Sequence, residues 1–73
     1  MIGYLTGEPM FFSDYVIIKT AGGVGYKVFV NQKTLAQNQI KTLDLFTYSY
    51  LKEDRSELYG FATSGELQLF VFL

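Results

Sequence analysis

The ten residues from Thr42 to Leu51 constrain the fold of this chain more than any other segment. They contain no glycine or proline and are rich in threonine, leucine and aromatic residues, which predicts a strand from Leu43 to Leu51. Alternate side chains of a strand point to opposite faces, and here Leu45 lies on one face and Phe46 and Tyr48 on the other. A strand with one solvated face would alternate apolar and polar residues. We therefore expect one face to line a small barrel and the other to need a cover.

The cover of that outer face is left open between two alternatives. One is the helix expected at the C-terminal end of this chain. The other is a second chain or a further domain. Hydrophobic residues make up 49% of the 73 residues and aromatic residues 18%, and a chain of this size buries only about 60% of its surface. Because this leaves more apolar surface than one small core can hide, the pattern favours the second alternative.

Turn residues divide the rest of the sequence into strands. The five predicted strands are Ile2 to Glu8, Tyr15 to Thr20, Tyr26 to Val30, Leu43 to Leu51 and Glu57 to Phe61. The glycine cluster from Gly22 to Gly25 predicts a hairpin turn, because glycine adopts positive φ without a steric cost. A dinucleotide-binding loop is rejected, since the third glycine of that motif is missing and the next segment is a strand.

Two short helical segments are also expected. Asn31 to Gln37 reads as a helical turn that Asn31 caps and that Leu35 and Ala36 anchor. Thr63 and Glu66 have the spacing of a capping box, which predicts the start of an amphipathic helix. The apolar residues that share one face of that helix are Leu67, Phe70 and Val71. Because this helix has only begun where the sequence stops, we expect a fragment or an N-terminal module.

The composition excludes several classes of function. The chain has no cysteine and no histidine, so Ser-His and Cys-His nucleophile pairs are absent, and its carboxylates follow no metal-binding spacing. We therefore predict no intrinsic enzymatic activity, no metal and no cofactor. No apolar run is long enough to cross a membrane and no signal peptide is present, so we expect a cytoplasmic protein. The net charge of −1 argues against tight binding to a phosphate backbone by this chain alone.

Two candidate nucleic-acid features remain. A five-stranded chain rich in tyrosine and phenylalanine is typical of OB-folds, which stack the bases of single-stranded nucleic acid on exposed aromatic rings, and Tyr48 and Tyr50 are candidates for such a platform. The lysines do not cluster along the sequence, so a core or interface role is favoured for both rings. Glu53 and Asp54, between Lys52 and Arg55, should sit at a hairpin tip, where composition alone favours a solvated turn.

Four short motifs in order resemble the N-terminal domain of the RuvA family, whose members recognise Holliday junctions. The motifs are Met1-Ile2-Gly3, Gly22-Gly23-Val24-Gly25-Tyr26, Glu53-Asp54 and Leu58-Tyr59-Gly60-Phe61. The resemblance extends along nearly the whole chain and includes Thr47 and the segment from Glu66 to Phe70. The chain departs from the family pattern at Tyr4, where a basic residue is common.

The resemblance implies an all-β, five-stranded OB-fold Greek-key barrel over residues 1–62. Residues 63–73 would begin a helix that leads into a helix-hairpin-helix domain outside this chain. It further implies a homotetramer on four-way junction DNA that recruits a RuvB-like ATPase for branch migration in recombination and repair, with ATP hydrolysis belonging to that motor. Glu53 and Asp54 correspond to the family's acidic pin, and Lys52, Arg55, Tyr48 and Tyr50 are candidate DNA or interface contacts.

Overall fold

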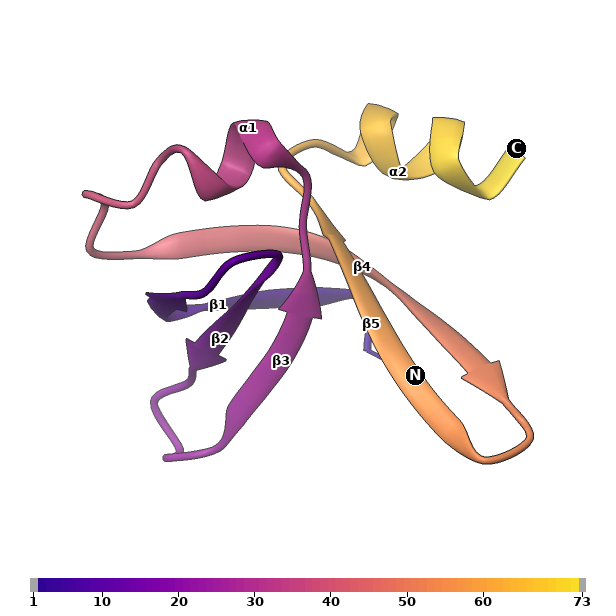
Figure 1. The fold of residues 1–73 in the computed structure, drawn as a ribbon, viewed down its shortest axis with the longest axis horizontal. Helices are drawn as coiled ribbons and strands as arrows, with labels where there is room; N and C mark the ends of the chain where they lie inside the picture. The colour runs from indigo at the N-terminus through magenta and orange to yellow at the C-terminus, as the bar shows by residue number, and fades with distance from the viewer. Residues whose placement is uncertain (1, 73) are drawn as a thin grey trace.

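The five expected strands form a closed barrel. The computed structural model describes residues 2–72 of the chain. Its elements are β1 (Tyr4–Phe11), β2 (Tyr15–Lys19), β3 (Gly25–Phe29), α1 (Gln32–Leu35), β4 (Leu43–Lys52), β5 (Arg55–Phe61) and α2 (Ser64–Phe72). The strands neighbour one another in the order β1-β2-β3-β5-β4, and β4 returns to pair with β1 (Figure 1). All pairs are antiparallel except β3 with β5. This is the arrangement of an OB-fold, and it confirms the predicted fold class.

The core follows from strict alternation along the strands. The buried apolar side chains are Leu5, Val16, Ile18, Val28, Leu43 and Leu45. On β4 the buried residues are Leu43, Leu45 and Thr47, which confirms the predicted inner face. Leu51 has the same parity but is 74% exposed, because β4 continues beyond the barrel wall into a free hairpin.

Strand β1 lies further along the chain than predicted and passes through Pro9. It pairs with β4 through Gly7, opposite Leu43, and with β2 from Glu8 to Phe11. Since proline has no N–H to give, it is tolerated where a strand has a neighbour on one side only. Gly7 marks the change of partner, where an added Cβ would lie 2.4 Å from the Lys19 carbonyl oxygen. Only glycine permits this close approach of β1 to β2.

The predicted turns and caps are present with one correction. Gly23 has φ of 90° in the turn between β2 and β3, and its N–H donates to the Thr20 carbonyl oxygen at 3.0 Å. The Asn31 side chain accepts from the Thr34 N–H at 2.9 Å and caps α1. Of the two expected anchors, Leu35 packs against the core and Ala36 is exposed. The second anchor is Thr34, which is buried.

Candidate functional site

The most prominent feature outside the barrel is the hairpin formed by β4 and β5. Towards the hairpin turn, the pairing of β5 with β3 ends at Leu58 opposite Val28. The pairing of β5 with β4 continues as far as Arg55 opposite Lys52. The hairpin therefore extends beyond the barrel as a two-stranded arm, at the lower right of Figure 1. The turn that joins its strands is tighter than predicted, because only Glu53 and Asp54 lie between them.

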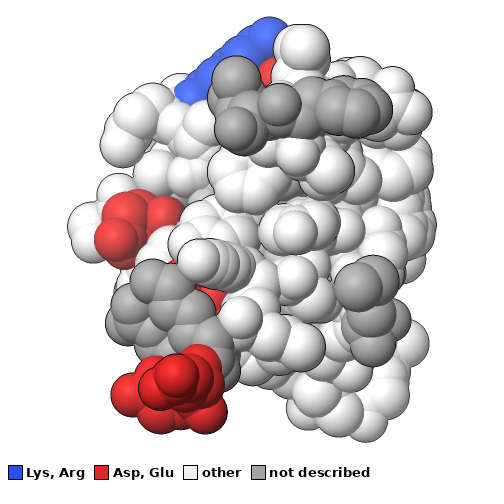
Figure 2. Space-filling view, turned by 90° about the vertical axis from the view of Figure 1, so that its right-hand side faces the viewer, with Lys and Arg blue, Asp and Glu red and all other residues white. Residues whose placement is uncertain are grey.

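Glu53 and Asp54 occupy the tip of this arm, as predicted. Both residues are exposed, and neither has a hydrogen-bond or ion-pair partner among the side chains that the structure describes. Figure 2 views the molecule from the side of the arm and shows acidic side chains protruding at the lower edge of a largely uncharged face. Two adjacent exposed carboxylates thus stand at the end of a protruding arm, between Lys52 and Arg55 in the sequence. The backbones of Lys52 and Arg55 form the last rung, but their side chains lie outside the described part of the chain.

The base of the arm is held by the N-terminal segment. The buried Thr47 hydroxyl donates a hydrogen bond to the Ile2 carbonyl oxygen, and the Thr47 N–H donates to the Gly3 carbonyl oxygen at 3.0 Å. The Ile2 N–H reaches Ser49 Oγ at 3.5 Å. These contacts tie β4 to the chain start at the level where the arm leaves the barrel. They fix the direction in which the tip points.

The C-terminal helix α2 covers part of the outer face of β4. The Thr63 hydroxyl accepts from the Glu66 N–H at 3.2 Å, which confirms the predicted cap of α2. The Phe70 ring of α2 lies 5.7 Å from the Tyr48 ring and 5.0 Å from the Phe61 ring. The less favoured of the two covers, a helix of this chain, thus lies on that face.

Tyr48 and Tyr50, the candidate stacking rings, lie in an aromatic cluster on the outer face of β4. Tyr48 is half-buried under Phe70, and the Tyr50 ring lies 6.4 Å from the Tyr59 ring. The Tyr59 hydroxyl in turn donates to Glu57 at 2.8 Å. Because both tyrosines belong to this packed cluster, the interpretation as a core or interface patch is the better one.

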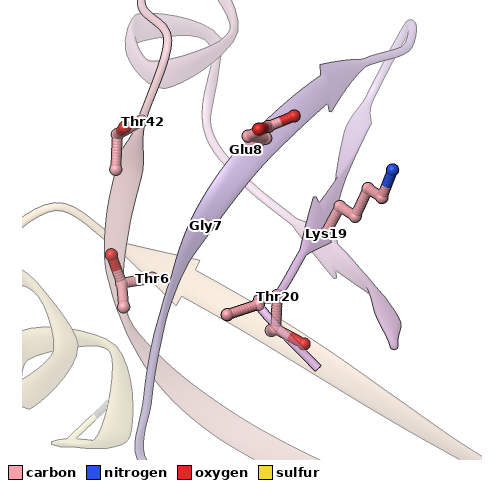
Figure 3. Close-up of a pocket in the computed structure, with 7 residues that line it drawn as sticks. Thr6, Gly7, Glu8, Lys19, Thr20 and Thr42 are labelled. Carbon is pink, nitrogen blue, oxygen red and sulfur yellow. The ribbon is translucent and has the colours of Figure 1, made fainter. Parts of the chain in front are cut away.

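A concave site at one end of the barrel offers little chemistry. It has a volume of about 430 Å³ and lies where β1 leaves β4 for β2 (Figure 3). Threonine side chains of β1 and of the start of β4 line one part of it, and Glu8 and Lys19 line another. The Thr6 hydroxyl donates a hydrogen bond to the Asp44 carboxylate. The hydroxyls have no histidine to activate them, since the sequence contains none.

The described residues 2–72 offer neither a metal-binding cluster nor a membrane-crossing helix. The described side chains include no group of three or more potential metal ligands close enough to hold an ion. Neither α1 nor α2 has the length and apolar character that a membrane-crossing helix requires. The acidic arm is therefore the site that the described structure and the sequence analysis share.

Sequence reasoning missed one cluster, on the outer face of β2 and β3. Tyr15 and Phe29 are opposite each other in register, and Lys27 Nζ lies over both rings. A turn separates Tyr15 from Lys27 and Phe29 in the sequence, so their proximity is not apparent from the order of residues. The signal that could have found them is the alternation itself, which places Tyr15 and Ile17 on one outward face and Lys27 and Phe29 on the next.

The sequence is similar to that of known proteins along the whole chain. Residues 1–60 match the model of the family described as the RuvA N terminal domain. Three proteins named Holliday junction branch migration complex subunit RuvA are similar to the chain. The protein from Halothermothrix orenii is 41% identical over 70 residues, which are 96% of this chain and 36% of the relative. The proteins from Rickettsia bellii and Nitratidesulfovibrio vulgaris are 40% and 41% identical over the whole chain, which covers 36% and 38% of their lengths. The chain thus spans little more than a third of the relatives it matches.

Proposed function

This chain belongs to the RuvA N-terminal domain family, and from that premise we propose that it is the barrel domain of a subunit that binds Holliday junctions during branch migration. In this proposal residues 1–62 form the scaffold domain, and residues 63–73 begin the helix that leads into a DNA-gripping helix-hairpin-helix domain. The domain itself catalyses no reaction. Four copies assemble on the junction, and a RuvB-like ATPase supplies the movement.

The observation that carries the proposal is the exposed acidic tip of the arm. Glu53 and Asp54 stand beyond the last rung shared with β3, so DNA phosphates can approach them without meeting the barrel first. Like charges repel, and the repulsion acts over roughly 8 Å at physiological ionic strength. We propose that the tip serves as an acidic pin that keeps exchanging strands apart and directs each into its new duplex.

In this proposal the acidic tip directs the DNA strands, and other groups bind the DNA. A domain of net charge −1 has little attraction of its own for the duplex arms of a junction, because binding to the duplex phosphate backbone depends on displacing counterions with lysine and arginine. Affinity would then come from basic groups in the following domain. The backbone and hydroxyl contacts between Thr47 and the chain start support the pin by holding the arm in one direction.

An arm without its two tip carboxylates tests the pin. The barrel is placed in the full-length Halothermothrix orenii relative in exchange for the corresponding domain, with and without Glu53→Gln and Asp54→Asn. We expect the double variant to bind a fluorescent four-way junction several times more tightly at low salt, because the carboxylates no longer repel phosphates while Lys52 and Arg55 remain. The difference should shrink as salt rises. Fluorescence of 2-aminopurine at the crossover should fall, since the central bases are no longer held apart.

The matched control is the double variant Glu8→Gln and Asp14→Asn. It removes the same charge from two exposed positions, one on β1 and one in the following turn. We expect junction affinity and crossover fluorescence to stay close to those of the parent protein. Equal effects of the two double variants would show that only net charge matters and would overturn the pin assignment.

A further inference from the structure

The outer face of β2 and β3 combines aromatic rings with positive charge. Alternation sends Val16, Ile18 and Val28 into the core, so the intervening residues face outward. The register places Tyr15 opposite Phe29 and Ile17 opposite Lys27. This face adjoins the base of the arm, because Lys27 lines one concavity with Leu51 and Ser56. Towards β5, the Phe29 ring lies 5.7 Å from the Tyr59 ring, and α2 packs on the β4 and β5 side of the barrel (Figure 1).

Three rings form a ladder across this face, which we call the Phe12 ladder: Phe12, Tyr15 and Phe29. The Phe12 and Tyr15 rings are stacked, with centroids 4.8 Å apart and planes at 11°. The Phe29 ring meets Tyr15 edge-on at 6.1 Å. Phe12 lies in the turn between β1 and β2, where its N–H donates to the Tyr15 carbonyl oxygen at 2.9 Å. The turn thus holds an aromatic ring that is 42% exposed in a fixed position.

Lys27 gives the ladder its charge. Its ammonium lies 4.5 Å from the Tyr15 ring centroid and 5.2 Å from that of Phe29, and the residue is exposed. Cation–π attraction holds a charge at the ring faces and leaves other N–H groups for an anion. The nearby acids are Asp14, beside Tyr15, and Glu8, opposite Lys19 in register. An anionic chain would therefore approach from the side of Lys27.

We propose that the Phe12 ladder binds unpaired nucleotides of single-stranded DNA, with a base stacked on Phe12 and Lys27 contacting an adjacent phosphate. Barrels of this topology commonly bind oligonucleotides on their second and third strands and on the loop between the first two. Aromatic rings accept any base, and the lysine complements the phosphate charge. The inference goes beyond the proposed function, because it involves other residues and another form of DNA than the acidic arm.

Anisotropy of a short fluorescein-labelled oligothymidylate, titrated with the chain at low salt, tests the proposal. We expect saturable binding. Phe12→Leu should weaken it about tenfold, since it removes the ring and keeps the side chain apolar. Lys27→Gln should weaken binding and make it less dependent on salt, as expected for the loss of one phosphate contact. The matched controls are Tyr4→Leu, an aromatic residue that is 50% exposed on β1, and Lys33→Gln on α1.

A second readout reports contact directly and does not depend on changes in affinity. Phe12→Trp introduces the only tryptophan, because the chain has none, and its fluorescence should be quenched by the oligothymidylate. The same substitution at Tyr4 should give no quenching. Absence of saturable binding by the parent chain, equal losses for Phe12→Leu and Tyr4→Leu, or equal quenching at the two tryptophans would each overturn the proposal. None of these results bears on the acidic arm, whose test uses a four-way junction.

Discussion

Gly60 on β5 shows how one missing side chain permits the core to close. A Cβ atom at this position would lie 2.6 Å from Val28 Cγ1 and 2.8 Å from Leu45 Cδ1. Both neighbours are fully buried, so neither has room to move aside. The sequence marks Gly60 only as part of a family motif. Its spatial role depends on two strands that lie far from it along the chain.

Replacing Gly60 with alanine should destabilise the barrel. We expect Gly60→Ala to lower the free energy of unfolding by about 1–3 kcal/mol, the usual cost of adding a methyl group to a filled core. Urea denaturation followed by circular dichroism measures the change. Gly22→Ala is the control, because no atom lies within 4 Å of its added Cβ, and its effect should stay within about 0.5 kcal/mol. Equal losses for the two variants would contradict the packing argument.

At the scale of elements, local chemistry predicts turns better than strand ends. The glycine cluster and the Asn31 cap act through their own backbones, so both are found where the sequence places them. The end of β1 depends on its partners instead. The sequence predicts a strand that ends at Glu8, yet β1 continues through Pro9, because only β2 pairs with that part. The pairing of β4 with β5 likewise sets the length of the acidic arm. Glu53-Asp54 contains no glycine and is not a sequence from which a two-residue hairpin turn would be predicted.

Among the described side chains of α2, the Phe70 ring makes the aromatic contacts with the barrel, and Leu67, one turn earlier in the sequence, is half-buried. Phe70 contacts Tyr48, Tyr59 and Phe61, with ring centroids 5.0 to 5.7 Å apart. The neighbouring Leu69 is 70% exposed. Periodicity predicts that Leu67, Phe70 and Val71 share the buried face. Phe70 meets the sheet and Leu67 is half-buried, whereas Val71 is 49% exposed, because the helix is apolar on most sides and its packed face is narrower than predicted.

Phe70→Ala should release α2 from the sheet. We expect the amides of residues 64–72 to exchange with solvent faster, and the free energy of unfolding to fall by about 1–2 kcal/mol, because Phe70 is only partly buried. Hydrogen exchange measured by NMR separates this local effect from global unfolding. Leu69→Ala should leave exchange in α2 nearly unchanged. Faster exchange of equal size in both variants would contradict the docking role of Phe70.

For the whole molecule, the sequence predicts the class of fold and the position of the acidic tip. The pattern of β4, where both faces are apolar, favours a small barrel, and the resemblance to the RuvA family implies that it is a five-stranded OB-fold. The tip follows from a charged pair between two predicted strands. The Phe12 ladder can be predicted only in part. Alternation places Tyr15, Lys27 and Phe29 on outward faces, but which of them meet depends on the register of β2 against β3, which the paired strands acquire only on folding.

Assembly is the property of the whole molecule that the proposed function requires. Leu51, at 74% exposed, is the most exposed large apolar residue described. It pairs with Ser56 on the arm, one rung before the last pair, Lys52 and Arg55. If four copies gather their tips around one opening, the arms are brought together and Leu51 is a natural contact.

Multi-angle light scattering should then show the mass rising with concentration from 8.3 kDa towards four copies. Leu51→Ser should shift this rise to higher concentration, whereas Val24→Ser, at an exposed position in the turn between β2 and β3, should not. A monomer at every concentration would contradict assembly by this domain, and equal shifts in the two variants would contradict the role of the arm.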